Sequence, residues 1–335
     1  MEGALRVLYA VLMVLSGTVA VCGNLCILTV VLLNRELRTD TLGLTLSFSL
    51  SDLATGLAII PFGVHNSLTW PDVYPSKGAM CQGSGFLLLL LQSSSIQSLT
   101  WATVDKFTAI CFALSYQSIW TTRRSGVLLA LIWLFCLLNA CLPLLGFGSY
   151  AYSESRFLCC LEFTPENRPF VMLWMVASIV VPILTMCSLY GYIVYIARKQ
   201  ARRGTFVCNE LHCFYVPANN YLRSSIVMVT TSVCLLVCWL PYISVCLYET
   251  FSGQQSQGFT SALSTWLVLT SSALNPWIIC MTQNRYRSAV HQSLGRFYQR
   301  CSGMFLQLHF QNSVVQLNTA SPTTATATTA ETRLA

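Results

Sequence analysis

The chain has 335 residues, of which 54% are apolar and 9% are charged, and its mean hydropathy is +0.59. Soluble domains carry about 25% charged residues, so this chain has too few charges to cover the water-exposed surface of a protein of its size. The composition argues against a soluble enzyme, a disordered protein or a nucleic-acid-binding protein, and it indicates that lipid is the main solvent.

Seven stretches are long and apolar enough to cross a membrane, because a helix needs about 20 apolar residues to span the hydrocarbon core. A β-barrel would instead show alternating segments of about ten residues, whereas runs such as Phe86–Leu91 and Leu128–Phe135 are apolar on every face. The sequence therefore predicts an all-α membrane protein with a seven-transmembrane helix bundle. The predicted spans are Val7–Leu33, Leu42–Leu68, Gly78–Phe112, Gly126–Phe147, Phe170–Ala197, Ile226–Phe251 and Phe259–Met281.

A short amphipathic helix is predicted at residues 283–299, directly after the last span. Apolar residues recur there at helical spacing among arginines, a pattern typical of a helix that lies on the inner membrane surface. The end of the chain is rich in threonine and alanine, which is typical of disorder. We therefore expect one helical domain at residues 1–300 and a disordered cytoplasmic tail at residues 301–335.

Lysine and arginine are unevenly distributed between the two ends of the predicted spans. Cytoplasmic loops retain positive charge, so the side with more of these residues is assigned to the cytoplasm. With the N-terminus outside, 15 of the 19 lysines and arginines lie inside, and the outer four are Arg6, Lys77, Arg156 and Arg168. The expected topology has an extracellular N-terminus and a cytoplasmic C-terminus.

Several polar side chains lie within the predicted spans, where charge is costly. Asp52 lies in the middle of the second span, and hydroxyl and amide side chains of other spans are its expected neighbours. A carboxylate with such neighbours suits a small cation such as sodium; the alternative is a hydrogen-bonded aspartate that only holds the bundle together. The polar residues are Asn24, Asp52, Ser95, Ser271, Ser272 and Asn275.

Five spans contain a proline, which removes an amide donor and can kink a helix. Such kinks suit a bundle that opens at one end, although membrane helices also tolerate proline without a hinge. The five prolines are Pro61, Pro143, Pro182, Pro241 and Pro276.

The 16 cysteines lie mostly within the spans, where they act as small apolar residues. Cys81, Cys159 and Cys160 are expected to face the outside, which is oxidising. A disulfide from Cys81 to either of the other two would hold the loop Gly148–Arg168 over the mouth of the bundle, and the sequence leaves the choice open. Cys301, next to a basic stretch, is either palmitoylated or a free thiol.

Each predicted span carries a recognisable set of residues. In chain order they are Gly23-Asn24, Leu50-Ser51-Asp52-Leu53-Ala54 with Pro61, Cys81, Val104-Asp105-Lys106-Phe107, Trp133 with Pro143, Pro182 with Tyr190, Cys238-Trp239-Leu240-Pro241-Tyr242 and Asn275-Pro276. Together they resemble the rhodopsin-like (class A) G-protein-coupled receptors, from about Val7 to Arg300. The resemblance implies a seven-helix receptor of the plasma membrane that signals to heterotrimeric G proteins.

Three positions depart from the family's pattern. The family's Asp-Arg-Tyr is Asp105-Lys106-Phe107 here, Ile279 replaces the tyrosine of its Asn-Pro-x-x-Tyr motif, and Leu235 replaces an aromatic residue in span six. Lys106 keeps the arginine's charge but lacks its planar fork of donors, and Tyr221 or a neighbour stands where the acidic partner is often found. We expect a weak inactive-state latch, with either raised basal activity or inefficient coupling.

The resemblance also implies a ligand pocket between spans three, five, six and seven. Amine receptors place an aspartate where Leu88 stands, and adenosine receptors place an asparagine where Cys246 stands, so both ligand classes are disfavoured. A neutral or lipid-like small molecule, or no ligand, remains. The implied pocket residues are Leu88, Leu89, Gln92, Trp239, Tyr242, Cys246 and Thr265.

On the inner side, the resemblance places Asp105, Lys106, Arg198 and Arg202 against the G protein, although positive-inside topology alone also explains the basic residues. Span six is expected to swing about Pro241 and open a cleft for a G-protein helix. The third span is similar to that of the adenosine receptors, which favours coupling to the cAMP-stimulating class. Threonines of the tail are candidate phosphorylation sites that would recruit an arrestin.

No cofactor is expected beyond a sodium ion, which Asp52, Ser95, Ser272 and Asn275 would hold in the resting state. The segment Cys208–Cys213, which includes a histidine, does not have the ligand spacing of a standard metal site.

The loop Gly148–Arg168 admits two interpretations. Its cysteines, acidic residues and aromatic residues would allow it to fold into the pocket as a lid or built-in agonist, or it is an ordinary solvated loop. The second interpretation is favoured, because connecting segments usually run over the surface.

Three other functions are alternatives to a signalling receptor. A secondary transporter would show inverted repeats and broken helices, and an intramembrane enzyme would need catalytic pairs inside the spans; neither pattern is present. A non-signalling or decoy receptor that modulates a partner keeps the fold, and the altered Lys106 and Ile279 favour it as the main alternative.

Overall fold

The computed structural model covers the chain and describes residues 2–37, 39–69, 78–203, 206–209, 212–215, 218–282, 285–296 and 299. The chain divides into two compact units, Met1–Arg287 and Ser288–Ala335. In the second unit, residues 288–296 are helical. All other described elements belong to the first unit.

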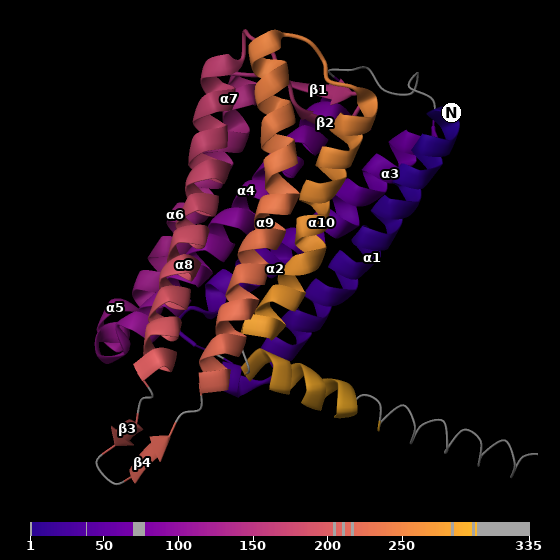
Figure 1. Cartoon of the computed structure of the whole chain (residues 1–335). Helices are drawn as coiled ribbons and strands as arrows, with labels where there is room; N and C mark the ends of the chain where they lie inside the picture. Colours follow the sequence, from indigo (N-terminus) through magenta and orange to yellow (C-terminus); the bar gives the residue numbers. More distant parts are fainter. Residues whose placement is uncertain are drawn as a thin grey trace, which may run out of the picture. The chain divides into compact units, whose positions relative to one another are not determined.

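The first unit contains seven long helical segments among the described residues (Figure 1). They are α1 (Glu2–Leu33); α2 (Leu42–Ala54), η2 (Thr55–Ile59) and α3 (Ile60–Leu68); α4 (Ala79–Cys111); α6 (Thr122–Cys141) with η5 (Leu142–Leu145); α7 (Arg168–Met175), η6 (Val176–Val180) and α8 (Val181–Arg203); α9 (Ala218–Ser252); and α10 (Gly258–Thr282). Short helices η1 (Arg35–Leu37), η4 (Ala113–Ser115) and α5 (Tyr116–Ile119) lie in the connections.

Six of these segments are long and apolar enough to cross a membrane, as judged over the described residues. Their apolar ranges are Gly3–Leu33, Leu42–Leu68, Thr122–Leu145, Arg168–Lys199, Met228–Ser252 and Gly258–Met281. The seventh segment, α4, is not among them, because the polar run Gln92–Ser98 lowers its mean hydropathy. That run is mostly buried against other helices, and α4 contacts α2, α6 and α8. The least apolar helix is therefore the one that lies among the others.

Two of the predicted proline kinks coincide with a wider helical turn. The π-helical turn η2 comes directly before Pro61, and η6 comes directly before Pro182. A π turn lets the helix absorb one extra residue, which relieves the clash of a proline ring with the preceding turn. Pro143 lies in the 3-10 turn η5, whereas Pro241 and Pro276 lie inside α9 and α10.

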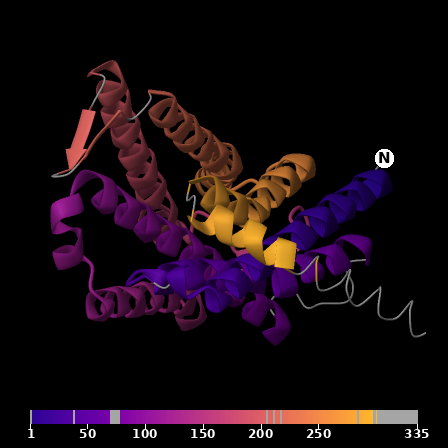
Figure 2. The ribbon, with the colours of Figure 1, turned by 90° about the horizontal axis from the view of Figure 1, so that it is seen from below.

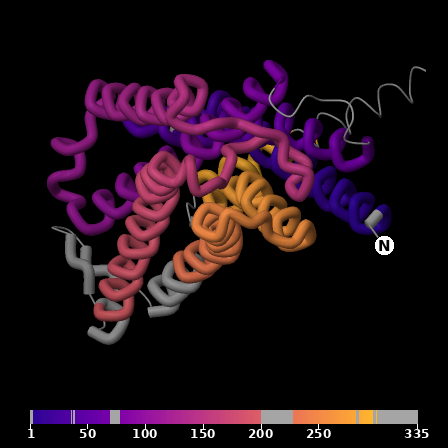
Figure 3. The backbone as a smooth tube through the Cα atoms, turned by 90° about the horizontal axis from the view of Figure 1, so that it is seen from above, coloured from indigo at the N-terminus to yellow at the C-terminus, as the bar shows by residue number. Residues whose placement is uncertain are grey.

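Two antiparallel hairpins interrupt the otherwise helical chain, and neither was expected from the sequence. In the α6–α7 connection, β1 (Tyr150–Ser153) pairs with β2 (Leu158–Leu161). In the α8–α9 connection, β3 (Phe206–Asn209) pairs with β4 (His212–Tyr215). The first of these, the β1–β2 hairpin, crosses one end of the bundle in the view from above (Figure 3).

Candidate functional site

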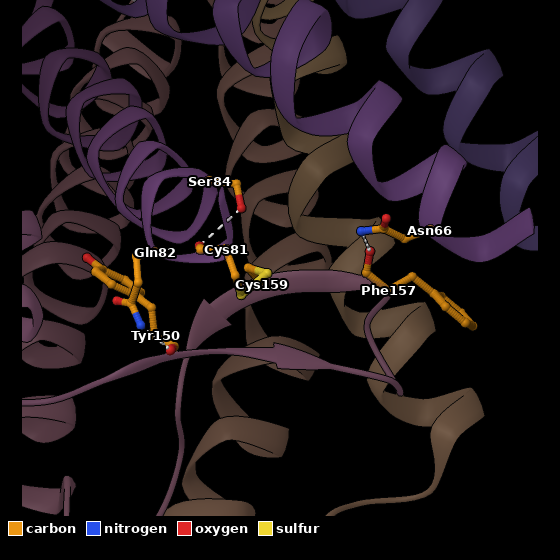
Figure 4. Close-up of a disulfide and its surroundings, with 7 residues drawn as sticks. All are labelled: Asn66, Cys81, Gln82, Ser84, Tyr150, Phe157 and Cys159. Carbon is orange, nitrogen blue, oxygen red and sulfur yellow. Dashed lines mark hydrogen bonds between the residues drawn. A yellow bond between two sulfur atoms is a disulfide. The ribbon is translucent and has the colours of Figure 1, made fainter. Parts of the chain in front are cut away.

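A disulfide attaches the β1–β2 hairpin to the start of α4 (Figure 4). The bond joins Cys81 to Cys159, and Cys160 is a free, buried thiol. This answers the question that the sequence left open. Two hydrogen bonds hold the hairpin at either side of the disulfide: the Gln82 side chain donates to the Tyr150 carbonyl at 3.0 Å, and the Asn66 side chain donates to the Phe157 carbonyl at 3.2 Å.

All four residues of β2 are buried, so this segment is not the ordinary solvated loop that we favoured from the sequence. The fully buried Tyr150 ring lies over Gly85 of α4, where a Cβ atom would approach the ring to 2.8 Å. The Tyr150 hydroxyl donates to the Ala140 carbonyl at 2.9 Å. The expectation was wrong because the buried strand is only four residues long and carries no periodicity that a longer element would show.

The β2 strand reaches the cavity between the helices. Cys160 and Leu161 line that cavity together with residues of α4, α7, α9 and α10. The space left free is about 30 Å³, whereas pockets for drug-sized ligands measure about 300–1,000 Å³. One water needs about 10–15 Å³ of such volume. The cavity as it stands therefore accommodates about two or three waters and no drug-sized molecule.

Six of the seven predicted pocket residues line this cavity: Leu88, Leu89, Gln92, Trp239, Tyr242 and Thr265. Cys246 is buried beside Tyr242 but is not part of the lining. Sequence reasoning missed the remaining lining residues because they belong to the hairpin or to helix faces that no motif marks. These are Gly85, Cys160, Leu161, Trp174, Val268 and Leu269.

Two buried polar atoms at the cavity have no hydrogen-bond partner within the protein. They are the Gln92 side-chain nitrogen and the Thr265 hydroxyl. Leaving such groups unpaired costs about 1–3 kcal/mol each. Water in the cavity offers each of these groups a hydrogen-bond partner.

A buried ion pair joins the same hairpin to the end of α9. The Arg156 guanidinium donates to the Glu249 carboxylate at 2.6 Å, and both side chains are 5% exposed. The second Glu249 oxygen accepts from the Ser256 backbone amide at 3.2 Å and from the Ser261 hydroxyl at 3.3 Å. The guanidinium also lies 5.0 Å from the centre of the Phe163 ring. No sequence pattern indicates this pair, because its members are 93 residues apart and neither belongs to a motif.

The predicted polar site in the middle of the bundle is assembled around Asp52. One carboxylate oxygen accepts from the Ser95 hydroxyl at 2.7 Å, and the other accepts from the Asn275 amide at 2.7 Å. The Ser272 hydroxyl interacts with the same carboxyl, and the Asn24 amide donates to the Ser272 carbonyl at 3.0 Å. Three predicted residues from two helical segments thus contact one fully buried carboxyl, and Asn24 joins them from a third segment through Ser272.

The donor set around Asp52 fits a hard cation. The side-chain oxygens of Asn24 and Asn275 are buried and accept no hydrogen bond, so acceptor oxygens are in excess there. Such oxygens suit sodium rather than a transition metal. In the described part of the chain, no group of three or more His, Cys, Asp or Glu side chains is arranged to hold a metal ion.

At the opposite end of the bundle, a polar cluster surrounds Asp105. Its carboxylate accepts from the Tyr116 hydroxyl at 2.7 Å and from the Thr41 hydroxyl at 3.2 Å. Partial burial and this contact with Asp105 raise the pKa of Tyr116, which keeps its hydroxyl a donor. The α4–α6 connection that carries Tyr116 lies at the edge of the bundle in the view from below (Figure 2).

The three basic residues predicted to meet a G protein lie next to Asp105 or at the end of α8. Lys106 is partly buried next to Asp105, and Arg198 near the end of α8 is exposed. Arg202 lies on the last turn of α8, and its side chain falls outside the described part. Cys301, the tail threonines and the side chain of Tyr221 also fall outside the described residues.

Comparison of this sequence with known proteins agrees with this arrangement. The family of seven-transmembrane receptors of the rhodopsin type matches residues 23–279. The histamine H2 receptor of Cavia porcellus is 26% identical over 86% of this chain and 79% of its own length. The adenosine receptor A3 of Ovis aries is 27% identical over 84% and 87%. The G protein-coupled receptor 161 of Bos taurus is 26% identical over 78% of this chain and 54% of its own length.

The chain therefore belongs to the rhodopsin family of seven-transmembrane receptors. This confirms the predicted class, the seven-helix bundle and the receptor function. Members of this family are not enzymes. The chain is a multi-pass plasma-membrane protein that couples to heterotrimeric G proteins.

Proposed function

We propose that this receptor signals without a diffusible agonist, because its own β1–β2 hairpin occupies the ligand cavity. The observation that carries the proposal is the burial of Cys160 and Leu161 in the cavity lining, which leaves about 30 Å³ free. A bound agonist stabilises the active arrangement of a receptor by its differential contacts. A tethered segment makes such contacts at very high effective concentration.

The ligands named for two relatives, histamine and adenosine, do not suit this cavity. Leu88 offers no charge to an ammonium group, and Cys246 offers no amide to a purine. A neutral or lipid-like small molecule would fit only after Leu161 leaves the cavity. Such a molecule would therefore compete with the hairpin and act as a modulator of the intrinsic signal.

At the cytoplasmic end, Asp105, Lys106, Arg198 and Arg202 form the proposed contact surface for the G protein. Lys106 makes a weaker latch than an arginine, because it lacks the planar fork that binds a carboxylate with two hydrogen bonds. A weak latch raises the population of the active state, in which α9 swings about Pro241. The favoured partner is a cAMP-stimulating G protein.

The remaining proposals concern the termini and the bundle centre. The N-terminus is extracellular and the C-terminus is cytoplasmic, palmitate on Cys301 anchors the start of the tail, and phosphorylated threonines of the tail recruit an arrestin. A sodium ion held by Asp52, Ser95, Ser272 and Asn275 favours the resting state. The unpaired acceptor oxygens of Asn24 and Asn275 support this assignment.

The test is basal second-messenger profiling at matched surface expression. The wild-type receptor is expected to raise basal cAMP above that of cells without it, and Leu161→Ala is expected to lower it towards that background. Lys106→Arg is expected to reduce it by strengthening the latch. Glu154→Ala, at the exposed turn of the same hairpin, is the matched control. Equal cAMP in cells with and without the receptor, or no effect of Leu161→Ala, would defeat the proposal.

A second candidate function is that of a non-signalling receptor that modulates a partner. It is favoured by Lys106 and by the buried Ile279, which replace two side chains used by signalling members of the family. Nucleotide exchange on purified G proteins separates the two. A receptor that catalyses no exchange on any G-protein class, while Lys106→Arg does, would support the second candidate.

A further inference from the structure

Two cysteines face each other in the register of the β3–β4 hairpin, a feature that the proposed function does not use. The hairpin connects α8 to α9 and forms a two-stranded sheet of its own (Figure 1). Within it, Cys208 of β3 lies directly opposite Cys213 of β4. The pairs on either side are Val207 with Phe214 and Asn209 with His212. Paired residues on both sides therefore define the position of the two cysteines.

This register brings the two cysteines within the range of a disulfide. Residues directly opposite each other in an antiparallel pair lie on the same face of the sheet, with Cα atoms about 4.5–5.5 Å apart. A disulfide joins residues whose Cα atoms are usually about 4.4–6.8 Å apart. The bond can therefore form without any change in the pairing of the strands.

The hairpin also gives such a bond something to stabilise. Two-stranded hairpins are only marginally stable in water when no third strand or helix supports them. Only four residues separate Cys208 from Cys213 in the sequence, so the two thiols meet at a high effective concentration. A bond across the strands would hold the hairpin closed.

We propose that Cys208 and Cys213 form a redox-sensing pair, which a peroxide converts into a disulfide and glutathione reduces again. The inference rests on the proposed topology, in which the α8–α9 connection is cytoplasmic. Disulfides in that reducing compartment are usually transient and serve as redox sensors. The Cys81–Cys159 bond lies on the opposite, oxidising side in this topology and is structural by contrast.

The oxidation proceeds in two steps. The thiolate of one cysteine attacks a peroxide oxygen, which breaks the O–O bond, leaves a sulfenic acid on the sulfur and releases one water. The thiolate of the other cysteine then attacks that sulfur, so that the S–S bond forms and a second water leaves. Both sulfurs are oxidised and the peroxide is reduced. Two molecules of glutathione return the pair to thiols and leave as their own disulfide.

Oxidation changes the connection that leads into α9, the helix proposed to move. With two thiols, the strands can separate and the whole of residues 204–217 can extend. With the disulfide, the strands stay paired, and the connection is shorter and stiffer. The redox state of one cysteine pair thus sets the freedom of the segment between α8 and α9.

The experiment is mass spectrometry of the full-length receptor in nanodiscs after treatment with hydrogen peroxide and alkylation of the free thiols. No lysine or arginine lies between Arg203 and Arg223, so trypsin releases both cysteines in one peptide. Glu210 is the one acidic residue of that peptide, and cleavage after it separates Cys208 from Cys213. The two fragments are expected to remain joined after peroxide treatment and to separate once glutathione is added.

Two variants test whether the register is the cause. Val207→Cys/Cys208→Ser moves one cysteine by a single position, to the other face of the hairpin, and should form the bond about tenfold more slowly, because the paired strands hold the thiols apart. Cys111→Ser, which removes a partly exposed thiol at the end of α4, is the matched control and should not change the rate. Hydrogen exchange at residues 206–209 and 212–215 should become slower in the oxidised wild type.

Three outcomes would overturn the proposal. Equal rates in the wild type and in Val207→Cys/Cys208→Ser would mean that a random loop closes the bond. Separate fragments after peroxide treatment would mean that no bond forms. Joined fragments from untreated cells, alkylated before lysis, would reveal a permanent disulfide in place of a redox sensor. None of these measurements involves a G protein, so they are independent of whether the receptor signals through its β1–β2 hairpin.

Discussion

At the scale of single residues, the buried charges decide the behaviour of the receptor. Asp52 and the Arg156–Glu249 pair lie out of contact with water, and each has partners that offset the cost of desolvation. The ion pair lies where the hairpin meets α9, the helix proposed to move. Its integrity should therefore affect both stability and signalling.

Glu249→Gln is expected to destabilise the receptor by about 3–5 kcal/mol, because it leaves the buried Arg156 without a counter-charge. The melting temperature of the purified receptor measures this loss. The double variant Arg156→Met/Glu249→Leu should lose less than Arg156→Met or Glu249→Leu alone, since it removes both charges together. The exposed Glu154→Gln is the control. A double variant that loses the sum of the two single effects would show that the charges are not coupled.

The Asp52 site predicts a stabilising effect of sodium. Replacing choline chloride by sodium chloride at constant ionic strength should raise the melting temperature of the wild type, by an amount equivalent to about 2.7 kcal/mol at 100 times the Kd. Asp52→Asn should abolish the rise, whereas Asp40→Asn, an exposed aspartate outside the site, should retain it. An equal rise in all three proteins would reveal a general salt effect instead.

At the scale of elements, the β1–β2 hairpin depends on a close approach to α4. Tyr150 lies directly on Gly85, and any side chain there would have to displace the ring. The disulfide at Cys81 and the hydrogen bond from Gln82 fix the same region of the hairpin. The start of α4, residues 81–85, therefore helps to fix the position of β2 in the cavity, together with the contacts within the hairpin.

Gly85→Ala is expected to lift the hairpin and to cost about 1–3 kcal/mol, the usual effect of overpacking. Hydrogen exchange at residues 158–161 should become faster, and basal signalling should fall with it. Gly83→Ala on the same helix is the matched control, because nothing lies within 4 Å of the added Cβ atom. Unchanged exchange in Gly85→Ala would mean that the hairpin does not depend on this contact.

At the scale of the whole molecule, the receptor is a bundle whose most polar helix is enclosed by more apolar ones. Hydroxyl pairs join α4 to α2, as in Ser51–Ser94 at 2.6 Å and Ser47–Ser98 at 2.8 Å, and the Trp133 indole donates to Ser47 at 3.0 Å. These bonds satisfy polar groups that lipid would leave unpaired. The polar side chains of α4 are therefore satisfied by its neighbours in the assembled bundle.

The expected topology predicts that the two termini lie on opposite sides of the membrane. An epitope tag at the N-terminus should bind antibody on intact cells, and a tag at the C-terminus should bind only after permeabilisation. A cytosolic marker protein controls for membrane integrity. Both tags detected on intact cells would contradict the topology and with it the proposed roles of the two ends.

The sequence by itself determined the class of the molecule. Length, hydropathy and charge bias are sums over many residues, so they identify seven membrane spans even when each boundary shifts by a few positions. The motif residues around Asp52 were predictable for a related reason: charge in lipid needs partners, and polar side chains within the spans are the groups that supply them. Residues such as Ser95 and Asn275 are therefore predictable from their positions in the spans.

The tertiary structure alone decided how the cavity is filled. The partner of Cys81, the burial of Leu161 and the pairing of Arg156 with Glu249 all depend on contacts between distant segments. A loop of this length has no periodicity that fixes its path, and a buried ion pair across 93 residues leaves no local pattern. Such features exist only once packing has brought the helices together, because burial is a property of the neighbours a residue acquires and not of the residue itself.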